Sequence, residues 1–276
     1  MKIILPSAGI ITEENPLKRI ELAGRVCYKS EDKITGESAP VFVQKLLDRG
    51  HLSPMEHARV VFHADNVMPR QLERALGPEP YGFRDRIGHP EGDMDIVYAN
   101  IRDLLAAGYD LEDLAKLPMA PDYMTVRFTC DRAIANELVR HRVFSFCQES
   151  TRYVCYSGEI EFVLPVPFAY YGRDGYAELL WRRSCKRSEE SYHELLYAGA
   201  SPQEARNVLP LSLKTELVMT GTHDQWKEML KLRLSPKAHP QMHYLMRKLV
   251  ELPGFPLEDI EVPKWQPELG MEGDRK

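Results

Sequence analysis

The side chains best suited to chemistry gather between residues 140 and 153, which read Arg-His-Arg-Val-Phe-Ser-Phe-Cys-Gln-Glu-Ser-Thr-Arg-Tyr. Arg140 and Arg142 flank His141, and Arg152 lies ten residues after Arg142. Guanidinium groups present a rigid fork of donors that matches the oxygens of phosphates and carboxylates. We therefore predict that this segment binds an anion, with a phosphate-bearing small molecule as the first candidate.

The pattern before this segment predicts a strand followed by a helix. Residues 123–129 alternate between apolar and polar side chains, which is typical of a strand. Asp131 is suited to cap a helix that runs on through Leu138 to His141. The Arg-His-Arg triplet then lies at a helix C-terminus, where a cation gains about 0.3–1 kcal/mol from the helix dipole. Arginines that only offset this dipole are the simpler alternative, but the irregular polar segment that follows favours a ligand.

Proline, glycine and capping signals predict the elements of the N-terminal half. The expected elements are a helix over about 16–28, a helix over 40–50, a capping-box turn at 53–56 and a strand at 59–63. Six prolines between residues 65 and 122 surround two short helical patterns, one of them near 94–107. We expect this segment to be an insertion.

The C-terminal half predicts alternating strands and helices up to a polar tail. The expected elements are a strand at 159–164, a helix over 175–199, a capping box at 201–204, an extended segment at 211–219 and helices over 224–232 and 240–252. Residues 1–264 are expected to form a single domain, and residues 265–276 a frayed tail.

Composition narrows the class of protein. The 276 residues carry a formal net charge of −5, which argues against a general nucleic-acid binder. The five cysteines show no zinc-ligand spacing, so we expect reduced thiols in the cytoplasm. No apolar run has the length of a signal peptide or a membrane span, and we therefore expect a soluble protein with no membrane partner.

The triplet belongs to a longer pattern that resembles a known family. Arg140-His141-Arg142, followed after seven residues by Ser150, is similar to the signature of the flavin-dependent thymidylate synthases. Three other blocks resemble that family in the same order along the chain. They are Gly-His-Leu-Ser-Pro-Met-Glu-His at 50–57, Glu-Ala-Arg with Leu-Pro-Leu at 204–211, and Leu-Arg-Leu with Ala-His-Pro at 232–240.

The resemblance implies a fold, a reaction and its cofactors. It implies an α/β (α+β) fold with a central, mostly antiparallel sheet flanked by helices. The implied reaction is the reductive methylation of dUMP to dTMP, with methylenetetrahydrofolate as carbon donor, FAD as electron carrier and NADPH as reductant. A redox cofactor must carry the electrons, because no side chain can replace it. The family also implies a homotetramer with active sites shared between subunits.

The resemblance also implies roles for individual residues. Arg233 matches the arginine that ionises uracil N3, and a fixed guanidinium there stabilises the developing anion without an enzyme nucleophile. The residues expected to contact the flavin are His51, Ser53, Arg140, His141, Arg142, Gln148, Thr222, His223, Asp224 and Glu228. The residues expected to contact dUMP are Glu137, Leu138, Val139, Arg140, Gln148, Glu149, Ser150, Thr151, Arg152, Arg206 and Arg233. Ser150 is expected to act as a hydroxyl ligand and not as a nucleophile.

Four positions depart from the family pattern. Glu137 stands where glutamine is common; because a carboxylate repels phosphate, we expect it to pair with an arginine. Cys147 stands where serine or asparagine is common, and we expect a small buried residue in preference to a thiol nucleophile. Thr222 and Glu228 replace asparagines, so their flavin roles transfer least directly.

Two other classes of protein remain as alternatives. The first is a non-enzymatic nucleotide- or RNA-binding module that uses the arginine-rich segment 140–152, with an affinity that falls steeply with salt. The second is a phosphohydrolase that uses histidines and a divalent metal. His51, His57 and His63 are each six residues apart, which is not a zinc-ligand spacing, so we expect no metal site.

Overall fold

A four-stranded antiparallel sheet forms the centre of the computed structural model, which describes residues 1–64, 95–166, 168 and 175–263. Its strands, in spatial order, are β2 (Ser7–Ile11), β5 (Tyr123–Asp131), β8 (Lys214–Thr222) and β6 (Ser145–Gln148). Strand β5 pairs with β8 along its whole length, from Tyr123 opposite Thr222 to Asp131 opposite Lys214. The expected α/β fold with a mostly antiparallel sheet is therefore confirmed.

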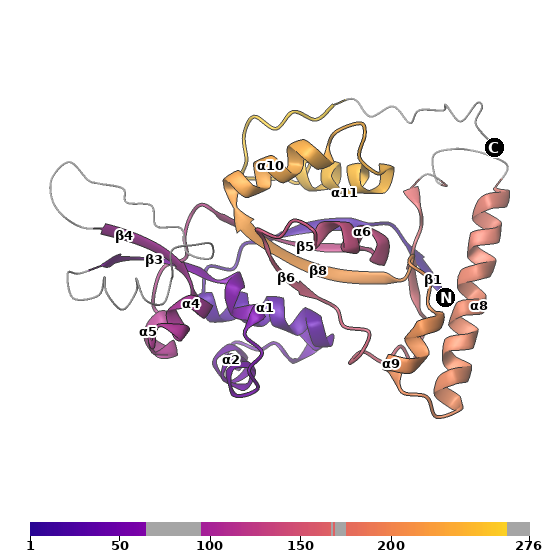
Figure 1. Cartoon of the computed structure of the whole chain (residues 1–276), viewed down its shortest axis with the longest axis horizontal. Helices are drawn as coiled ribbons and strands as arrows, with labels where there is room; N and C mark the ends of the chain where they lie inside the picture. The colour runs from indigo at the N-terminus through magenta and orange to yellow at the C-terminus, as the bar shows by residue number, and fades with distance from the viewer. Residues whose placement is uncertain (65–94, 167, 169–174, 264–276) are drawn as a thin grey trace.

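Helices cover both faces of this sheet (Figure 1). On one face lie α6 (Arg132–Leu138), α10 (His223–Arg233) and α11 (Pro240–Val250). Their apolar side chains form the main core with the strands, around Phe128, Leu217 and Trp226, each 0% exposed. On the other face, α1 (Pro16–Tyr28) packs Ala23 and Val26 against Cys147 and Val218. Because both faces are covered, β8 is buried from Lys214 to Gly221, with only Thr222 partly exposed.

The predicted N-terminal helices are confirmed. Asn15 accepts a hydrogen bond from the Lys18 backbone amide at 3.0 Å and caps α1, whose bounds match the expected helix. The second helix, α2 (Ser38–Asp48), begins two residues before the expected start. It ends before Gly50, whose φ of 69° lies in the left-handed region that glycine adopts without strain. The two helices pack together beneath the sheet (Figure 1).

Two predictions in the next segment are correct only in part. Residues 53–56 open a short 3₁₀ helix, η2 (Ser53–His57), without a capping hydrogen bond from a side chain. The predicted helix near 94–107 is half strand: β4 (Asp95–Asn100) pairs with β3 (Arg59–Ala64), and only α4 (Ile101–Ala106) is helical. Strand pairing satisfies the backbone of both segments, and this tertiary contact overrides the helical spacing. A short helix, α5 (Leu111–Leu114), follows.

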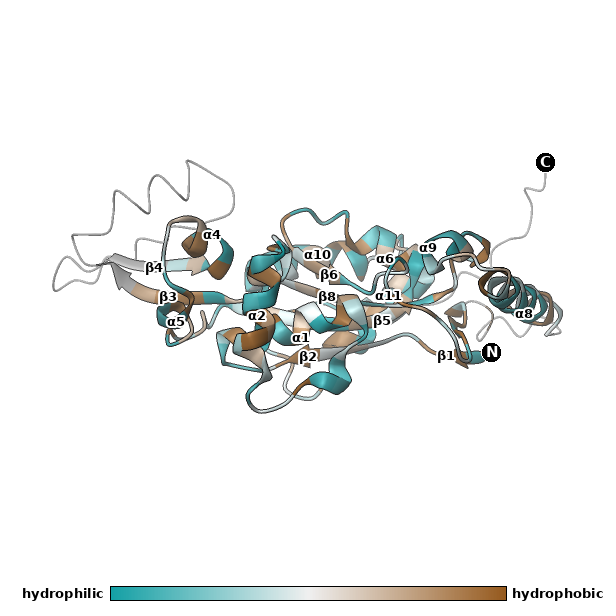
Figure 2. Cartoon of the chain, turned by 90° about the horizontal axis from the view of Figure 1, so that it is seen from below, coloured by the Kyte–Doolittle hydropathy of each residue, from teal (hydrophilic) through white to brown (hydrophobic). Residues whose placement is uncertain are grey.

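A smaller layer lies at the opposite end of the sheet from β3 and β4 (Figure 1). Strand β1 (Lys2–Ile4) runs parallel to β7 (Glu161–Val163), which confirms the strand expected at 159–164 in shortened form. The long helix α8 (Tyr176–Tyr197) is confirmed, and among its residues only Cys185, Glu189 and Tyr192 are buried. Its ribbon is largely teal in Figure 2, so most of its residues are hydrophilic, as expected for a helix with one buried stripe.

The remaining C-terminal elements largely agree with the sequence. The capping box at Ser201 and Glu204 is confirmed and opens α9 (Pro202–Ala205), which runs into a 3₁₀ turn, η3 (Arg206–Val208). The extended segment begins and ends three residues later than expected, as β8, and α10 and α11 occupy the expected places. No helix in the described part of the chain is long and apolar enough to cross a membrane. The expected frayed tail lies outside the described residues.

Candidate functional site

Strand β6 divides the arginine-rich segment into two parts. The triplet at 140–142 precedes the strand, and residues 149–152 follow it. A strand rises about 3.3 Å per residue, so the four residues of β6 separate its two ends by roughly 10 Å. The predicted site residues of one chain therefore form two groups, one at each end of β6.

The first group joins α6, the triplet and α10, and we call it the Arg233 cluster: Glu137, His141 and Arg233. Arg233 donates from Nη1 to Glu137 Oε2 and from Nε to His141 Nε2, each at 2.9 Å. Its Nη2 reaches the Glu137 backbone carbonyl at 3.4 Å. The prediction that Glu137 pairs with an arginine is confirmed, and the partner is the arginine expected to activate the substrate.

The protonation state of His141 follows from this geometry. Because Arg233 Nε is a donor, His141 Nε2 must accept, which requires a neutral ring with its proton on Nδ1. Burial and the neighbouring charge of Arg233 lower the pKa of His141 below its ordinary value of 6.5. The neutral ring is therefore the stable form at neutral pH, and it helps to orient the guanidinium.

A shallow groove of about 800 Å³ runs from His141 along α10. It contains two further residues expected to contact the flavin, Asp224 and Glu228, together with the exposed apolar side chains of Val143 and Leu232. These apolar side chains are 65% and 58% exposed. The groove thus combines polar groups with an uncovered apolar surface.

Two residues predicted near this groove have structural partners. Thr222 is the N-cap of α10: its side chain accepts from the Gln225 amide at 3.3 Å, and the Gln225 side chain accepts from the Thr222 amide at 2.8 Å. The His223 amide donates to the Asp122 carbonyl at 2.8 Å. The Thr222 hydroxyl therefore acts in a capping box, which is sufficient reason for its presence.

The arginines of the triplet are free to bind a ligand. Arg140 and Arg142 are exposed, and neither forms an ion pair with any residue that the structure describes. Leu138, by contrast, is fully buried in the main core, so any contact from it to a ligand must come from its backbone. Val139 is 37% exposed at the end of α6.

The second group surrounds the end of β6 at Gln148 and the loop that follows it, at residues 149–152. The Ser150 amide donates to the Cys27 carbonyl at 3.1 Å, and this bond ties the loop to the end of α1. Arg206 Nη1 donates to Thr151 Oγ1 at 3.0 Å, so the structure brings two residues expected to bind dUMP together across 55 positions. Arg152 remains exposed and lies over the Tyr153 ring at 5.5 Å.

Two buried charges that the sequence did not single out, Lys214 and Glu216, support this loop together with Glu149. Glu149 is 1% exposed and accepts from Tyr156 Oη at 2.8 Å and from Lys214 Nζ at 3.2 Å. Lys214 also donates to Glu216 Oε1 at 2.6 Å. Burial alone would lower the pKa of Lys214, but Glu149 and Glu216 hold it above its ordinary value. This cation therefore fixes a residue expected to contact dUMP.

The upstream block lies close to the far end of the 140–153 segment. His51 is exposed, and its Nδ1 is 2.6 Å from the Tyr28 hydroxyl. The Tyr28 ring lies 5.7 Å from that of Tyr153, measured between centroids. Ser53 is exposed nearby in the chain, with its side chain not used for capping. The sequence did not indicate Tyr28 as the connection between these segments.

Two other candidate residues, Cys147 and His57, are buried. Cys147 is 2% exposed and packs against α1, which confirms the expectation of a small buried residue. His57 is fully buried and lies 2.7 Å from Thr220 Oγ1 through its Nδ1. Within the described ranges, no three His, Cys, Asp or Glu side chains gather in an arrangement that could hold a metal ion.

The residues present fit an anionic dinucleotide cofactor. Arg140 and Arg142 offer unpaired guanidinium groups for phosphate oxygens, and the apolar patch at Val143 and Leu232 offers a surface for a flat ring. His141 lies between these two features. The donor set is thus suited to FAD, although the residues lie on an open surface of one chain.

Comparisons with known proteins agree with this chemistry. The family model described as thymidylate synthase complementing protein matches residues 10–76 and 116–253. Flavin-dependent thymidylate synthase from Mycolicibacterium vanbaalenii is 24% identical over 262 residues, covering 88% of this chain and 79% of the relative. The enzyme of that name from Pyrococcus furiosus is 30% identical over 125 residues, covering 44% of this chain and 50% of the relative.

The family match has a gap at residues 77–115, inside the segment that the sequence predicts as an insertion. The matched residues include both groups at the ends of β6, the His51 block and Arg206. With this match over most of its length, the chain belongs to the family of thymidylate synthase complementing proteins, the flavin-dependent thymidylate synthases.

Proposed function

We propose that this chain is a flavin-dependent thymidylate synthase that converts dUMP to dTMP, with FAD as electron carrier, NADPH as reductant and methylenetetrahydrofolate as carbon donor. The family match and its relatives support the reaction. The observation that carries the site assignment is the Arg233 cluster. A guanidinium held by Glu137 and a neutral His141 is a fixed donor whose orientation does not depend on the substrate.

Arg233 is the proposed catalytic residue. When dUMP binds beside it, the guanidinium stabilises negative charge at uracil N3, and this raises the electron density at the carbon that receives the new bond. No nucleophile of the protein is required. Cys147 is buried between β6 and α1, and Ser150 acts as a hydroxyl ligand of the nucleotide. Preorganisation by two hydrogen-bond partners keeps the cost of orienting Arg233 low.

FAD supplies the electron transfer that side chains cannot perform. The residues proposed to hold it are His51, Ser53, Arg140, His141, Arg142, Gln148, His223, Asp224 and Glu228. The exposed arginines of the triplet suit its pyrophosphate, because charge-assisted bidentate hydrogen bonds to phosphate are strong. Thr222 contributes less directly, through the start of α10 that it caps.

The loop at 148–152 is the proposed nucleotide-phosphate site. Arg152 is exposed, and Arg206 already reaches this loop through Thr151. Guanidinium groups form charge-assisted hydrogen bonds suited to the oxygens of a phosphate monoester. The buried Glu149 acts from behind, as an anchor of the loop through Tyr156 and Lys214.

The proposed assembly is a homotetramer in which different copies complete each site. Two observations support a shared site. The two groups of site residues lie at opposite ends of β6, and exposed apolar side chains accompany the Arg233 cluster at Val143 and Leu232. Burial of this apolar surface by a second copy contributes about 25 cal/mol to the free energy of association for each Å² buried.

The test is a visible spectrum combined with a dTMP assay. Purified protein is expected to show flavin bands near roughly 370 and 450 nm, as the cofactor's own chemistry dictates. It should form dTMP from dUMP, methylenetetrahydrofolate and NADPH. A colourless protein that takes up no added FAD and forms no dTMP contradicts the proposal. If such a protein bound RNA with a steep salt dependence, the nucleic-acid alternative would replace it.

A further inference from the structure

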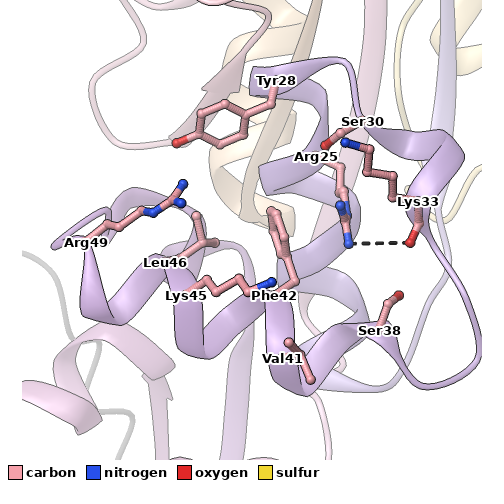
Figure 3. A pocket seen from close by; sticks show the side chains of 10 residues that line it. All are labelled: Arg25, Tyr28, Ser30, Lys33, Ser38, Val41, Phe42, Lys45, Leu46 and Arg49. Atoms are coloured by element: carbon pink, nitrogen blue, oxygen red, sulfur yellow. Dashed lines mark hydrogen bonds between the residues drawn. The ribbon is translucent and has the colours of Figure 1, made fainter.

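A second pocket, of about 600 Å³, lies between α1, α2 and the 3₁₀ turn η1 (Glu31–Lys33). Its lining includes four cations and two aromatic rings (Figure 3). These six residues are Arg25, Lys33, Lys45, Arg49, Tyr28 and Phe42. The pocket belongs to neither of the groups at the ends of β6.

One of the four cations is already neutralised. Arg25 donates from Nη2 to Glu21 Oε1 at 2.7 Å, and its guanidinium lies 4.2 Å from the centroid of the Phe42 ring. Both side chains of this ion pair are nearly buried, at 10% and 1% exposed. Arg25 therefore forms part of the wall, and it keeps Phe42 in place at the pocket.

The other three cations are not compensated. Lys33, Lys45 and Arg49 are exposed, and none forms an ion pair with a residue in the described ranges. Figure 3 shows Arg49 and Lys45 directed toward the space between Tyr28 and Phe42. Like charges that share a small space repel each other, and this chain has an overall excess of acids. Such an arrangement is stabilised when an anion occupies the space between the cations.

Tyr28, which lines the pocket, also contacts His51, a residue expected to contact the flavin. The Tyr28 hydroxyl lies 2.6 Å from His51 Nδ1, and the two rings are nearly parallel, with an interplanar angle of 16°. A molecule that lies on the exposed His51 ring therefore has the pocket within reach of its other end. By this geometry, an anion in the pocket and a group stacked on His51 belong to one extended ligand.

We propose that this pocket binds the multiply charged anionic end of a co-substrate whose ring system lies near His51. This inference rests on the proposed function. Two co-substrates of that reaction carry such an end: the glutamyl carboxylates of the folate, and the phosphates of NADPH. Both ends carry several negatively charged oxygen groups in a row. Such a row pairs with several separated cations better than with a single guanidinium that chelates one group.

The test uses charge-removing variants of the full-length protein that keep the length of each side chain close to native. Lys33→Gln, Lys45→Gln and Arg49→Gln are made singly and together. Lys18→Gln is the matched control, because Lys18 is exposed on α1 but does not line the pocket. Dissociation constants are measured for tetrahydrofolate with one and with three glutamates, and for NADPH and NADH.

The wild type is expected to bind one of the two multiply charged probes about tenfold more tightly than its less charged counterpart. The preference is limited to this size because each exposed charge pair contributes only a modest binding free energy. The triple variant should reduce this preference to about twofold, with the control unchanged. Loss of the preference for three glutamates assigns the pocket to the folate, and loss of the preference for NADPH over NADH assigns it to the nicotinamide dinucleotide.

Equal binding of all four probes by wild type and triple variant overturns the inference. The binding measurements also separate it from the proposed function, because they do not depend on turnover. A wild-type protein that forms no dTMP contradicts the proposed function, whereas a charge preference that vanishes in the triple variant still supports the pocket.

Discussion

Arg233 and Glu137 form an ion pair at 2.9 Å across 96 positions of the chain, and this pair joins α10 to α6. His141 completes the arrangement from the other side of the guanidinium. An arginine side chain has many rotamers, and ordering it costs roughly 1.5–2 kcal/mol of side-chain entropy. The hydrogen bonds to Glu137 and His141 offset this entropy cost in the folded protein before a substrate binds. The fold therefore positions Arg233.

The first prediction concerns Glu137. Glu137→Gln keeps a hydrogen-bond acceptor but removes the charge that holds Arg233 Nη1. Because Glu137 is partly exposed, we expect an effect of about threefold to tenfold on kcat for dTMP formation, with little change in stability. Flavin content should be unchanged. Steady-state kinetics with Glu14→Gln as an exposed control checks this, and an unaltered kcat would show that Glu137 does not position Arg233.

The second prediction concerns the pH dependence of His141. Its pKa is lowered by burial and by Arg233, so its folded-state value lies below its unfolded one. The stability that the neutral ring contributes is present above about pH 6.5 and is lost as the pH falls through the lowered pKa. Arg233→Gln removes the neighbouring charge and should move the pKa of His141 up toward its ordinary value. Titration of His141 by NMR in both proteins measures this shift; a value at or above 6.5 in the wild type is incompatible with the bond to Arg233.

The third prediction concerns the buried cation behind the nucleotide loop. Lys214→Met removes the cation from the buried Glu149, while Glu216 keeps its bonds to Lys29 and Arg127, and we expect a loss of about 3–5 kcal/mol in the free energy of unfolding. Lys2→Met is the control, since Lys2 pairs with Glu161 but is 60% exposed, and it should cost less than about 1 kcal/mol. Urea unfolding at a fixed protein concentration compares the two. Equal effects would mean that Lys214 does not anchor the loop.

The fourth prediction concerns acid stability and His57. This histidine is fully buried beside Thr220, and burial lowers its pKa from 6.5 to about 3. The unfolded state therefore binds a proton first as the pH falls, and stability declines between about pH 6.5 and 3. Each pKa unit corresponds to about 1.4 kcal/mol. The carboxylate of Glu216, with a pKa of about 2, adds acid sensitivity only below about pH 4.5.

The slope of stability between pH 6.5 and 5 tests this assignment. Across that interval, the free energy of unfolding should fall by less in His57→Gln than in the wild type. This comparison does not depend on the stability of the variant at pH 7. The difference between the two proteins should continue down to about pH 3, where it adds to a loss of stability from carboxylates such as Glu216 that both proteins share. If the free energy of unfolding changes equally with pH in both proteins between pH 6.5 and 5, groups other than His57 cause the acid sensitivity.

Local signals predicted most of the fold because they act over a few residues. Asn15 before Pro16 and the box at Ser201 give the helix starts that the structure contains. The segment at 95–100 was predicted incorrectly because its state depends on pairing with β3, more than thirty residues away. The capping pattern at Ser53 failed for a related reason: the buried His57 and Met55 fix a 3₁₀ turn there by packing.

The candidate site was predictable in its residues but not in its contacts. The sequence indicated an arginine partner for Glu137, but the choice of Arg233 depends on how α10 packs beside α6. Lys214 was missed although it and Glu216 occupy alternate positions at the start of β8, which places both side chains on one face of the strand. Its role appears only when the register of β6 and β8 brings it to Glu149.

The central claim is that Arg233 activates the nucleotide, and Arg233→Ala tests it most directly. Flavin content from the visible spectrum and dTMP formation under saturating substrates are measured on the same preparation, with Lys227→Ala as a control that is exposed on α10 and does not line the groove. We predict that Arg233→Ala retains flavin and loses dTMP formation by about a hundredfold or more, as expected when a group that stabilises developing charge is removed. A variant that keeps its flavin and forms dTMP at the wild-type rate would contradict the account.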